Sequence, residues 1–186
     1  MWLLSGVKKP YRGKIIKKGK VALLPQSVQN LFSRDKVSKE LEGCENSLIE
    51  EMEIQDILNR HPYDISGGQQ QKVALAKILM GNPDILLLDE PTKAIDEVYK
   101  EELGNLLRKL SADGKTIIIV SHDLDFCGEY ADRCGMFADG KLIAVNNSRD
   151  FFTSNNFYTT TVAKMSRSTI KGAVKMEDIV CYLKNV

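Results

Sequence analysis

Two short groups of residues in the middle of the chain have the types and spacing that phosphate binding requires. Ser66, Gly67 and Gly68 stand at the start of a helical pattern, where small residues leave the backbone N–H groups unobstructed. Free amide donors and the positive end of a helix dipole attract an anion such as phosphate. Asp89 and Glu90 form an acidic pair directly after an apolar run. The sequence therefore indicates a phosphate at the helix start and a ligand near the acidic pair.

Residues 85–88 predict the strand that positions the acidic pair. They form a continuous apolar run of strand length, with Pro83 before it and Pro91 after it. Such a run is typical of a strand buried on both faces. Asp89 and Glu90 then lie at the carboxyl end of the strand, where open α/β sheets place their ligands. The alternative, two solvated loop carboxylates, is disfavoured by the buried strand before them.

Other stretches predict the elements around this strand. The helix that begins at the Ser-Gly-Gly turn has apolar residues at helical spacing over residues 70–80, so one face packs on the core. Residues 116–120, TIIIV, predict a second fully buried strand. The remaining predicted elements are strands at 14–17 and 19–24, helices at 48–58, 97–110 and 126–131, and a hairpin of strands 134–138 and 141–145 joined by Asp139-Gly140.

The two groups of residues together resemble a known family. SGGQ at residues 66–69 followed by LLLDEP at residues 86–91 is similar to the signature and Walker B motifs of an ATP-binding cassette (ABC) ATPase. Either motif alone is weak, but the pair in this order with a helix between is highly specific. The resemblance implies an α/β fold: a partial ABC ATPase core, P-loop NTPase-like, with a mostly parallel buried sheet, a short helical subdomain and a C-terminal extension.

The resemblance also implies roles in ATP hydrolysis. Asp89 would hold Mg2+ through water, and Glu90 would orient or deprotonate the attacking water. Gln26, after the VALLPQ strand, resembles the Q-loop glutamine that contacts Mg2+ or that water. His122, after TIIIV, resembles the switch histidine that contacts the γ-phosphate. His122 and Gln26 could each be structural, but their places in the motif order favour function.

The family works as a head-to-tail dimer, which implies roles for further residues. Each ATP lies between the phosphate loop of one cassette and the signature of the other, so Ser66, Gly67, Gly68 and Gln69 would bind a nucleotide held by a partner. Asp96 lies in PTKAID, residues 91–96, which resembles the D-loop less closely. The implied partners are a second ABC ATPase domain and an integral membrane transport component, with no nucleic acid.

The phosphate loop itself does not occur in the sequence. A nucleotide-binding cassette needs Gly-x-x-x-x-Gly-Lys-Ser/Thr between a strand and a helix. Gly114-Lys115-Thr116 is the nearest match, but Lys109 stands at the first glycine position and the context is helix to strand. Because residues 3–6, LLSG, resemble the end of the helix that follows the loop, we expect a chain truncated before residue 1 and little ATPase activity from it alone.

Domain boundaries follow from the same resemblance. We predict an incomplete ABC ATPase domain at residues 1–148, with its helical subdomain at about 31–80, and a C-terminal extension at 149–186. The extension resembles the end of the second half of a duplicated energy-coupling-factor (ECF) importer ATPase. Its aromatic residues, in DFF at 150–152 and NNFYTT at 155–160, could form a satellite core or a partner surface.

Composition limits the class of protein. The chain has 186 residues with 26 Lys and Arg against 25 Asp and Glu, so no overall field attracts nucleic acid or anionic lipid. No apolar stretch reaches the roughly 20 residues that span a bilayer. We therefore expect a cytoplasmic protein, and the resemblance to importer ATPases implies that it is peripheral on the inner face of the cell membrane. The four cysteines form no Cys-x-x-Cys pair, which disfavours a zinc or redox site.

Three functions compete at this stage. The first is the ATPase subunit, or a piece of one, that energises a vitamin or metal-ion importer of the ECF type. The second is a non-catalytic cassette remnant that only supplies a signature motif or dimer interface to a partner. The third, a soluble ABC ATPase of DNA repair or translation, lacks support because no long coiled coil, zinc module or charged linker is visible.

Overall fold

The computed structural model describes residues 1–93, 95–154 and 158–185. The chain divides into two compact units, residues 1–121 and residues 122–186. Each unit is described by itself. The division reflects packing, so the domain boundaries expected from the family pattern, at 148 and 149, remain predictions.

The first unit is built on a parallel sheet. Strands β1 (Val21–Leu24), β2 (Ile85–Asp89) and β3 (Thr116–Val120) pair in the order β1-β2-β3, with Leu24 opposite Leu88 and Asp89 opposite Val120. The three central leucines of β2 are at most 1 % exposed. The prediction of a strand buried on both faces is therefore confirmed for β2, and the mixed α/β fold with a parallel sheet is confirmed as well.

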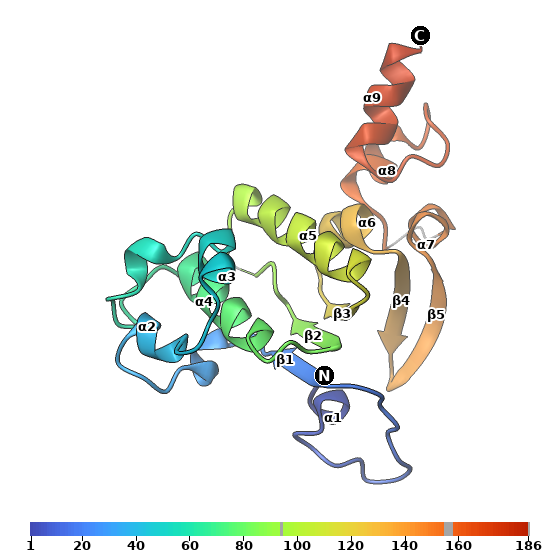
Figure 1. Ribbon diagram of the computed structural model, residues 1–186. Coiled ribbons are helices and arrows are strands. Elements are labelled where there is room, and N and C mark those ends of the chain that lie inside the picture. Colours follow the sequence, from blue (N-terminus) through green and yellow to red (C-terminus); the bar gives the residue numbers. More distant parts are fainter. Residues whose placement is uncertain (94, 155–157, 186) are drawn as a thin grey trace. The chain divides into compact units, whose positions relative to one another are not determined.

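Helices precede and follow the central strand. Helix α4 (Gly67–Leu79) contacts β1, and α5 (Glu97–Ala112) contacts β3 (Figure 1). Val73, Leu75 and Ala76 of α4 are fully buried, as the helical spacing predicts. The non-strand elements of this unit are α1 (Trp2–Ser5), the 3-10 turn η1 (Val28–Leu31), α2 (Val37–Glu40), α3 (Asn46–Glu51), the 3-10 turn η2 (Gln55–Ile57), α4 (Gly67–Leu79) and α5 (Glu97–Ala112).

Three predicted elements of this unit differ from the structure. Residues 14–17 form no strand; they are rich in lysine, Ile15 and Ile16 are exposed, and no neighbouring strand pairs with them. The helix predicted at 48–58 breaks at Glu53, whose φ is +51°. The break lets Met52 and Ile54 both enter the core, whereas a continuous helix would point them to different sides.

Strand β3 is the third difference, because it is not fully buried. Ile118 and Val120 are 40 % and 47 % exposed, while Ile117 and Ile119 are half-buried. Among the described residues β3 pairs with β2 alone. An edge position explains why an apolar run that predicts a central strand shows the alternating burial of a half-covered one.

The second unit packs helices on a two-stranded antiparallel sheet. Its elements are α6 (Leu124–Tyr130), β4 (Arg133–Ala138), β5 (Lys141–Asn147), α7 (Ser148–Ser154), α8 (Thr161–Ser166) and α9 (Met176–Lys184). The predicted hairpin is confirmed: Asp139 and Gly140 both have positive φ, +49° and +73°, as a two-residue hairpin turn requires.

Two aromatic residues of the C-terminal segment, Phe151 and Phe152, form a satellite core. Phe151 and Phe152 pack edge to face, with ring centroids 5.2 Å apart, and are buried with Val174. Tyr158, by contrast, is exposed. The same alternative, satellite core or partner surface, applies to residues 155–157, which lie outside the described residues.

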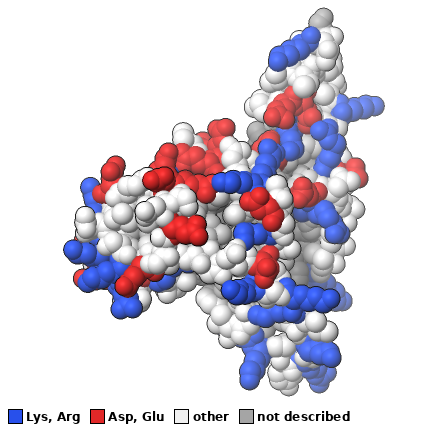
Figure 2. All heavy atoms as spheres, in the orientation of Figure 1, with Lys and Arg blue, Asp and Glu red and all other residues white. Residues whose placement is uncertain are grey.

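Three general properties concern hydropathy, charge and cysteines. No helix in the part of the chain that the structure describes is long and apolar enough to cross a membrane. The face shown in Figure 2 carries both basic and acidic side chains, in a chain with 26 Lys and Arg and 25 Asp and Glu. All four cysteines are free thiols.

Candidate functional site

The three parallel strands bring sequence-predicted residues to one edge of the sheet. Because β1 and β2 run in the same direction in register, their carboxyl ends meet. Gln26 follows β1 by two residues and is exposed. Asp89 ends β2, and Glu90 follows it; both are half-buried. This edge is where open α/β sheets bind their ligands.

The backbone of Glu90 holds its carboxylate in a special position. Its φ is +51°, a left-handed conformation that is unusual for a non-glycine residue. The Glu90 N–H donates to the Val120 carbonyl over 2.8 Å, which fixes the turn against the end of β3. Glu90 Oε2 accepts from Ser121 Oγ over 3.4 Å. Strained backbone conformations of this kind cluster at functional sites.

The loop after Glu90 is tied to the helix that begins at the signature turn. Gln71 Nε2 donates to the Pro91 carbonyl over 3.1 Å, and this contact is buried. Thr92 is also buried, with its Oγ1 3.5 Å from Ser121 Oγ. Helix α4, the turn after β2 and the end of β3 therefore form one connected polar structure.

The predicted signature turn opens α4 with a capping box. Ser66 Oγ accepts from the Gln69 N–H over 3.3 Å, and Gln69 Oε1 accepts from the Ser66 N–H over 3.0 Å. A side chain added at Gly67 would meet nothing within 4 Å. Packing within the chain therefore does not explain glycine at this position, whereas a ligand that approaches the helix start does.

Asp96 caps the following helix in the structure. Its Oδ1 accepts from the Tyr99 N–H over 2.8 Å at the start of α5. A Cβ added at Gly68 would lie 4.0 Å from the Tyr99 ring, and Lys72 Nζ lies 5.0 Å from the centre of that ring. The side chain of Tyr99 thus links the signature turn to the segment with D-loop similarity. Ala94, in the same segment, lies outside the described residues.

A second set of contacts joins α4 to the segment after Gln26. Gln29 Nε2 donates to Gln70 Oε1 over 3.2 Å. Lys77 donates to the Leu31 carbonyl over 2.8 Å and forms an ion pair with Glu40. The strand of Gln26 and the helix of Ser66 are therefore linked through polar contacts of η1 and α2.

Glu40 is the centre of that link. Its carboxylate is fully buried and accepts from the backbone N–H groups of Ser33 and Arg34 as well as from Lys77. Burial alone would raise the pKa of Glu40, but the hydrogen bonds from Lys77, Arg34 and Ser33 outweigh it and hold the pKa below its ordinary value. Glu40 is therefore an ionised, structural carboxylate.

Sequence reasoning did not single out Gln70, Gln71, Lys77 or Tyr99. Gln70 and Gln71 are buried although they are polar, and Gln71 bonds a backbone carbonyl. Two adjacent glutamines within an otherwise amphipathic helix are the only sequence signal of this arrangement. Lys77 and Tyr99 have no such signal, because their partners are distant in sequence.

His122 begins the second unit and is exposed. The next residue, Asp123, caps α6 by accepting from the Phe126 N–H over 3.0 Å. Along the chain, His122 therefore lies between the end of β3 and the start of α6. Its approach to a γ-phosphate remains a prediction from the motif order.

The oxygen donors at the sheet edge suit a magnesium ion that is shared with a nucleotide. Mg2+ takes oxygen ligands and is usually held by one or two carboxylates together with substrate phosphates. Asp89 supplies a half-buried carboxylate, and Gln26 an exposed amide oxygen. Within the described ranges no three His, Cys, Asp or Glu side chains form a metal cluster. The residues fit Mg2+ brought with phosphates and do not form a cage of their own.

Comparison with known proteins identifies the family. The family model described as ABC transporter matches residues 1–93, which is half of the chain. The chain therefore belongs to the ABC transporter family, whose ATPase members bind ATP.

Individual relatives agree with this assignment. A Bacillus thuringiensis protein, provisionally named an ABC transporter ATP-binding protein, is 36 % identical over 202 positions, which cover 95 % of this chain and 37 % of that protein. An energy-coupling factor transporter ATP-binding protein of Oenococcus oeni is 37 % identical over 55 % of this chain and 36 % of its own length. The chain thus spans little more than a third of either relative.

A solved structure supports the fold. A dimeric ATP-binding cassette in a post-hydrolysis state, bound to ADP and Pi, superposes with a TM-score of 0.62 at 30 % identity. The match covers 70 % of this chain and 63 % of the cassette chain. The parallel sheet and the helices around it are therefore those of an ABC ATPase.

Proposed function

We propose that residues 1–186 form the signature and Walker B part of an ATPase that energises a membrane importer of the ECF type. The observation that carries the proposal is the buried contact from Gln71 to the Pro91 carbonyl. It joins the helix of the Ser66 turn to the loop after Asp89 and Glu90. One rigid structure thus presents both an anion-binding turn and the carboxylates of hydrolysis.

The reaction class is attack of water on the γ-phosphoryl group of ATP. Glu90 orients the attacking water or accepts its proton, and its left-handed backbone fixes the carboxylate for that task. Asp89 would hold Mg2+ through water, and Gln26, two residues after the neighbouring strand β1, would contact the same ion or the attacking water. Bound Mg2+ would neutralise developing charge on the phosphates. His122 contacts the γ-phosphate.

The signature turn acts on a nucleotide held by another cassette in a head-to-tail dimer. The N–H groups of Gly67 and Gly68 belong to the first turn of a 13-residue helix, and a Cβ added at Gly67 would meet nothing within 4 Å. The capping box already satisfies the N–H of Ser66 and of Gln69, so two glycine donors remain for the phosphate oxygens. Asp96, near the start of α5, faces the same partner.

Importer type and location extend this proposal. The similarity to an energy-coupling factor ATP-binding protein supports the ECF class, and in that class the cassette binds an integral membrane component at the inner face of the cell membrane. The third candidate of the sequence analysis, an ATPase of DNA repair or translation, gains no site from the geometry. The second candidate is a remnant that only supplies its signature turn to a partner. Two experiments distinguish it from a catalytic ATPase.

The first test measures ATP hydrolysis by the polypeptide of residues 1–186. We expect no Mg2+-dependent activity, because its sequence contains no phosphate loop to hold the phosphates. Activity that vanishes in Glu90→Gln would overturn this expectation and show that the chain is self-sufficient.

The second test measures help to another cassette. The partner is a complete ABC cassette whose own signature serine has been replaced, so that hydrolysis depends on a signature supplied in trans. We expect residues 1–186 to restore hydrolysis and Ser66→Arg to abolish the effect by filling the anion site. The exposed Asp64→Arg, two residues away, is the matched control. Equal stimulation by both variants would contradict the role of the turn.

A further inference from the structure

The C-terminal helix α9 carries an apolar stripe that the described part of its unit leaves uncovered. Met176, Ile179, Val180 and Leu183 recur at the spacing of one helix face. Met176 is 62 % exposed and Leu183 67 % exposed, and none of the residues of α9 is buried. An amphipathic helix with an open apolar face normally has something to cover it.

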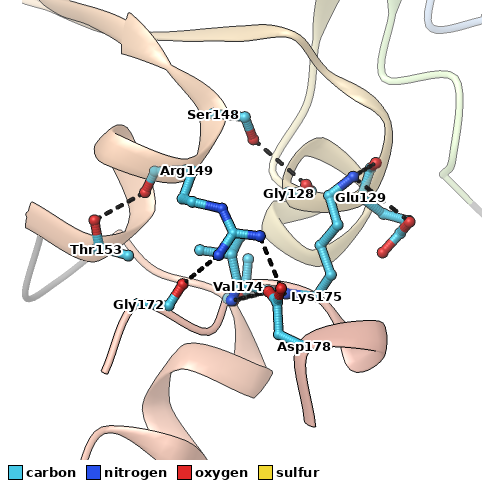
Figure 3. Close-up of polar contacts among 10 residues, drawn as sticks. Gly128, Glu129, Ser148, Arg149, Thr153, Gly172, Val174, Lys175 and Asp178 are labelled. Atoms are coloured by element: carbon cyan, nitrogen blue, oxygen red, sulfur yellow. Dashed lines mark hydrogen bonds and ion pairs between the residues drawn. The ribbon is translucent and has the colours of Figure 1, made fainter. Parts of the chain in front are cut away.

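The start of α9 is firmly attached to its unit. Figure 3 shows Asp178 accepting from the N–H groups of Val174 and Lys175, over 2.8 and 3.0 Å, and from Arg149 over 2.7 Å. Arg149 also donates to the Gly172 carbonyl over 2.9 Å. These contacts fix the first turn of the helix, which begins the stripe at Met176, to its unit.

A second anchor acts on the same turn. Lys175 Nζ donates to the Glu129 carbonyl over 2.6 Å, which ties the start of α9 to α6 (Figure 3). Asp178 follows Met176 by two residues and precedes Val180 by two, so at 100° per residue it lies on the side of α9 away from them. The attachment is made by the first turn of α9, on the side of Asp178. Met176 and the residues from Val180 to Asn185 are exposed, whereas Ile179 is half-buried.

The charges beside the stripe indicate what covers it. Glu177 and Lys184 are seven residues apart, hence two turns apart on the same flank of the helix. When two such helices pair antiparallel about a two-fold axis, each flank meets the same flank of its copy in reverse order. Glu177 of each chain then lies beside Lys184 of the other, twice in one interface.

We propose that α9 pairs with α9 of a second copy of this chain, in an antiparallel contact along Met176, Ile179, Val180 and Leu183. A nine-residue helix buries less surface than a stable dimer needs, so the pairing is weak, with a dissociation constant on the order of tens of micromolar. The contact uses neither nucleotide nor the signature turn. It therefore goes beyond the proposed ATPase role, and failure of one leaves the other intact.

The test is sedimentation of the 186-residue protein over a concentration series, under reducing conditions and without nucleotide. We expect a reversible monomer–dimer equilibrium. Leu183→Gln should remove the dimer, whereas Cys181→Gln, an exposed position on the side of α9 away from the stripe, should leave it unchanged. A wild-type protein that stays monomeric well above the expected dissociation constant, or equal loss in both variants, would overturn the proposal.

Charge exchange tests the antiparallel geometry and separates it from damage to folding. Glu177→Lys alone and Lys184→Glu alone each place two like-charge pairs in the interface, and each should weaken self-association about tenfold. A mixture of the two variants restores both opposite-charge pairs in a heterodimer. Dimer recovery in the mixture is the expected result. A mixture that associates no better than either variant alone would rule out the antiparallel arrangement.

Discussion

Glu40 in the first unit and Asp178 in the second are each held by the same two kinds of partner. Each carboxylate accepts from two backbone N–H groups and one basic side chain: Lys77 for Glu40 and Arg149 for Asp178. In each case burial raises the pKa, but the hydrogen bonds outweigh burial and lower it. The surroundings differ, since the Glu40 side chain is fully buried and that of Asp178 is 20 % exposed.

The difference shows how one motif serves two purposes. Around Glu40 it joins segments distant in sequence, because Lys77 lies on the helix of the signature turn and also binds the Leu31 carbonyl. Around Asp178 it fixes one turn of a terminal helix. A buried pair is costly to break from one side, whereas a solvent-accessible one is replaced in part by water. The following predictions test that contrast.

Loss of the cation beside Glu40 should have the largest effect. Lys77→Met leaves a buried carboxylate without its counter-charge, and we expect the free energy of unfolding of the first unit to fall by about 3–5 kcal/mol. Lys39→Met is the matched control, because Lys39 and Asp35 form an ion pair in which both side chains are more than half exposed; its loss should cost about 0–1 kcal/mol. Urea unfolding measures both, and equal losses would contradict the contrast.

Loss of the charge at position 178 should have an intermediate and local effect. We expect Asp178→Asn to weaken the attachment of α9 by about 1–3 kcal/mol, since the ion pair with Arg149 disappears while some hydrogen bonds survive. Hydrogen exchange measured by mass spectrometry should accelerate in residues 172–184 and not in α4. Glu177→Gln, on the same helix, is the control at low protein concentration. Faster exchange throughout both units would show that the anchor is not local.

Acid should protonate both carboxylates and remove the stabilisation that each provides to the folded state. Because the folded pKa lies below the unfolded value in each case, the stabilisation is complete above the unfolded pKa and is lost as pH falls through the folded pKa. The ordinary values are 4.5 for Glu40 and 3.8 for Asp178, so the loss begins near these values and ends below them. In Lys77→Met and Asp178→Asn the acid dependence of exchange in α4 and α9, respectively, should flatten.

The smallest effect is expected at the Tyr99 hydroxyl, whose surroundings differ from those of Glu40 and Asp178. The Tyr99 hydroxyl is buried and has no hydrogen-bond partner among the described residues, and burial raises the pKa of Tyr99. Tyr99→Phe should therefore leave the free energy of unfolding unchanged or raise it by up to about 1 kcal/mol, since only an unsatisfied group is removed. Tyr99→Leu, which also removes the ring beside Lys72, is the control and should destabilise. A clear loss in Tyr99→Phe would reveal a partner for the hydroxyl.

Sequence alone predicted the parts of the fold that short-range patterns determine. The strand at Leu86 to Leu88, the helix that begins at the Ser66 turn and the turn at Asp139-Gly140 follow from an apolar run, apolar residues at helical spacing and turn residues. The helix expected at 48–58 failed because burial of Met52 and Ile54 overrode local propensity. The strand at Thr116–Val120 was expected to be central, and its edge position depends on pairing that a single segment cannot reveal.

The candidate site divides in the same way. Ser66, Asp89 and Glu90 were found because their neighbours in sequence carry the pattern, and the structure places Asp89 and Glu90 at the strand end as expected. Gln71, Lys77 and Tyr99 were missed because each acts on a partner 20 or more residues away or through ring packing. The catalytic and binding roles themselves remain proposals that the Glu90 and Ser66 variants test.

The left-handed backbone conformation of Glu90 costs the fold stability, whereas the proposed reaction needs a carboxylate at this position. Glycine adopts that conformation freely, while a glutamate held there costs on the order of 1 kcal/mol. A library randomised at position 90 and selected only for thermal stability should therefore accumulate glycine and asparagine. The same library selected for import by a complete transporter should keep glutamate, so the residue recovered reports which pressure shaped the site.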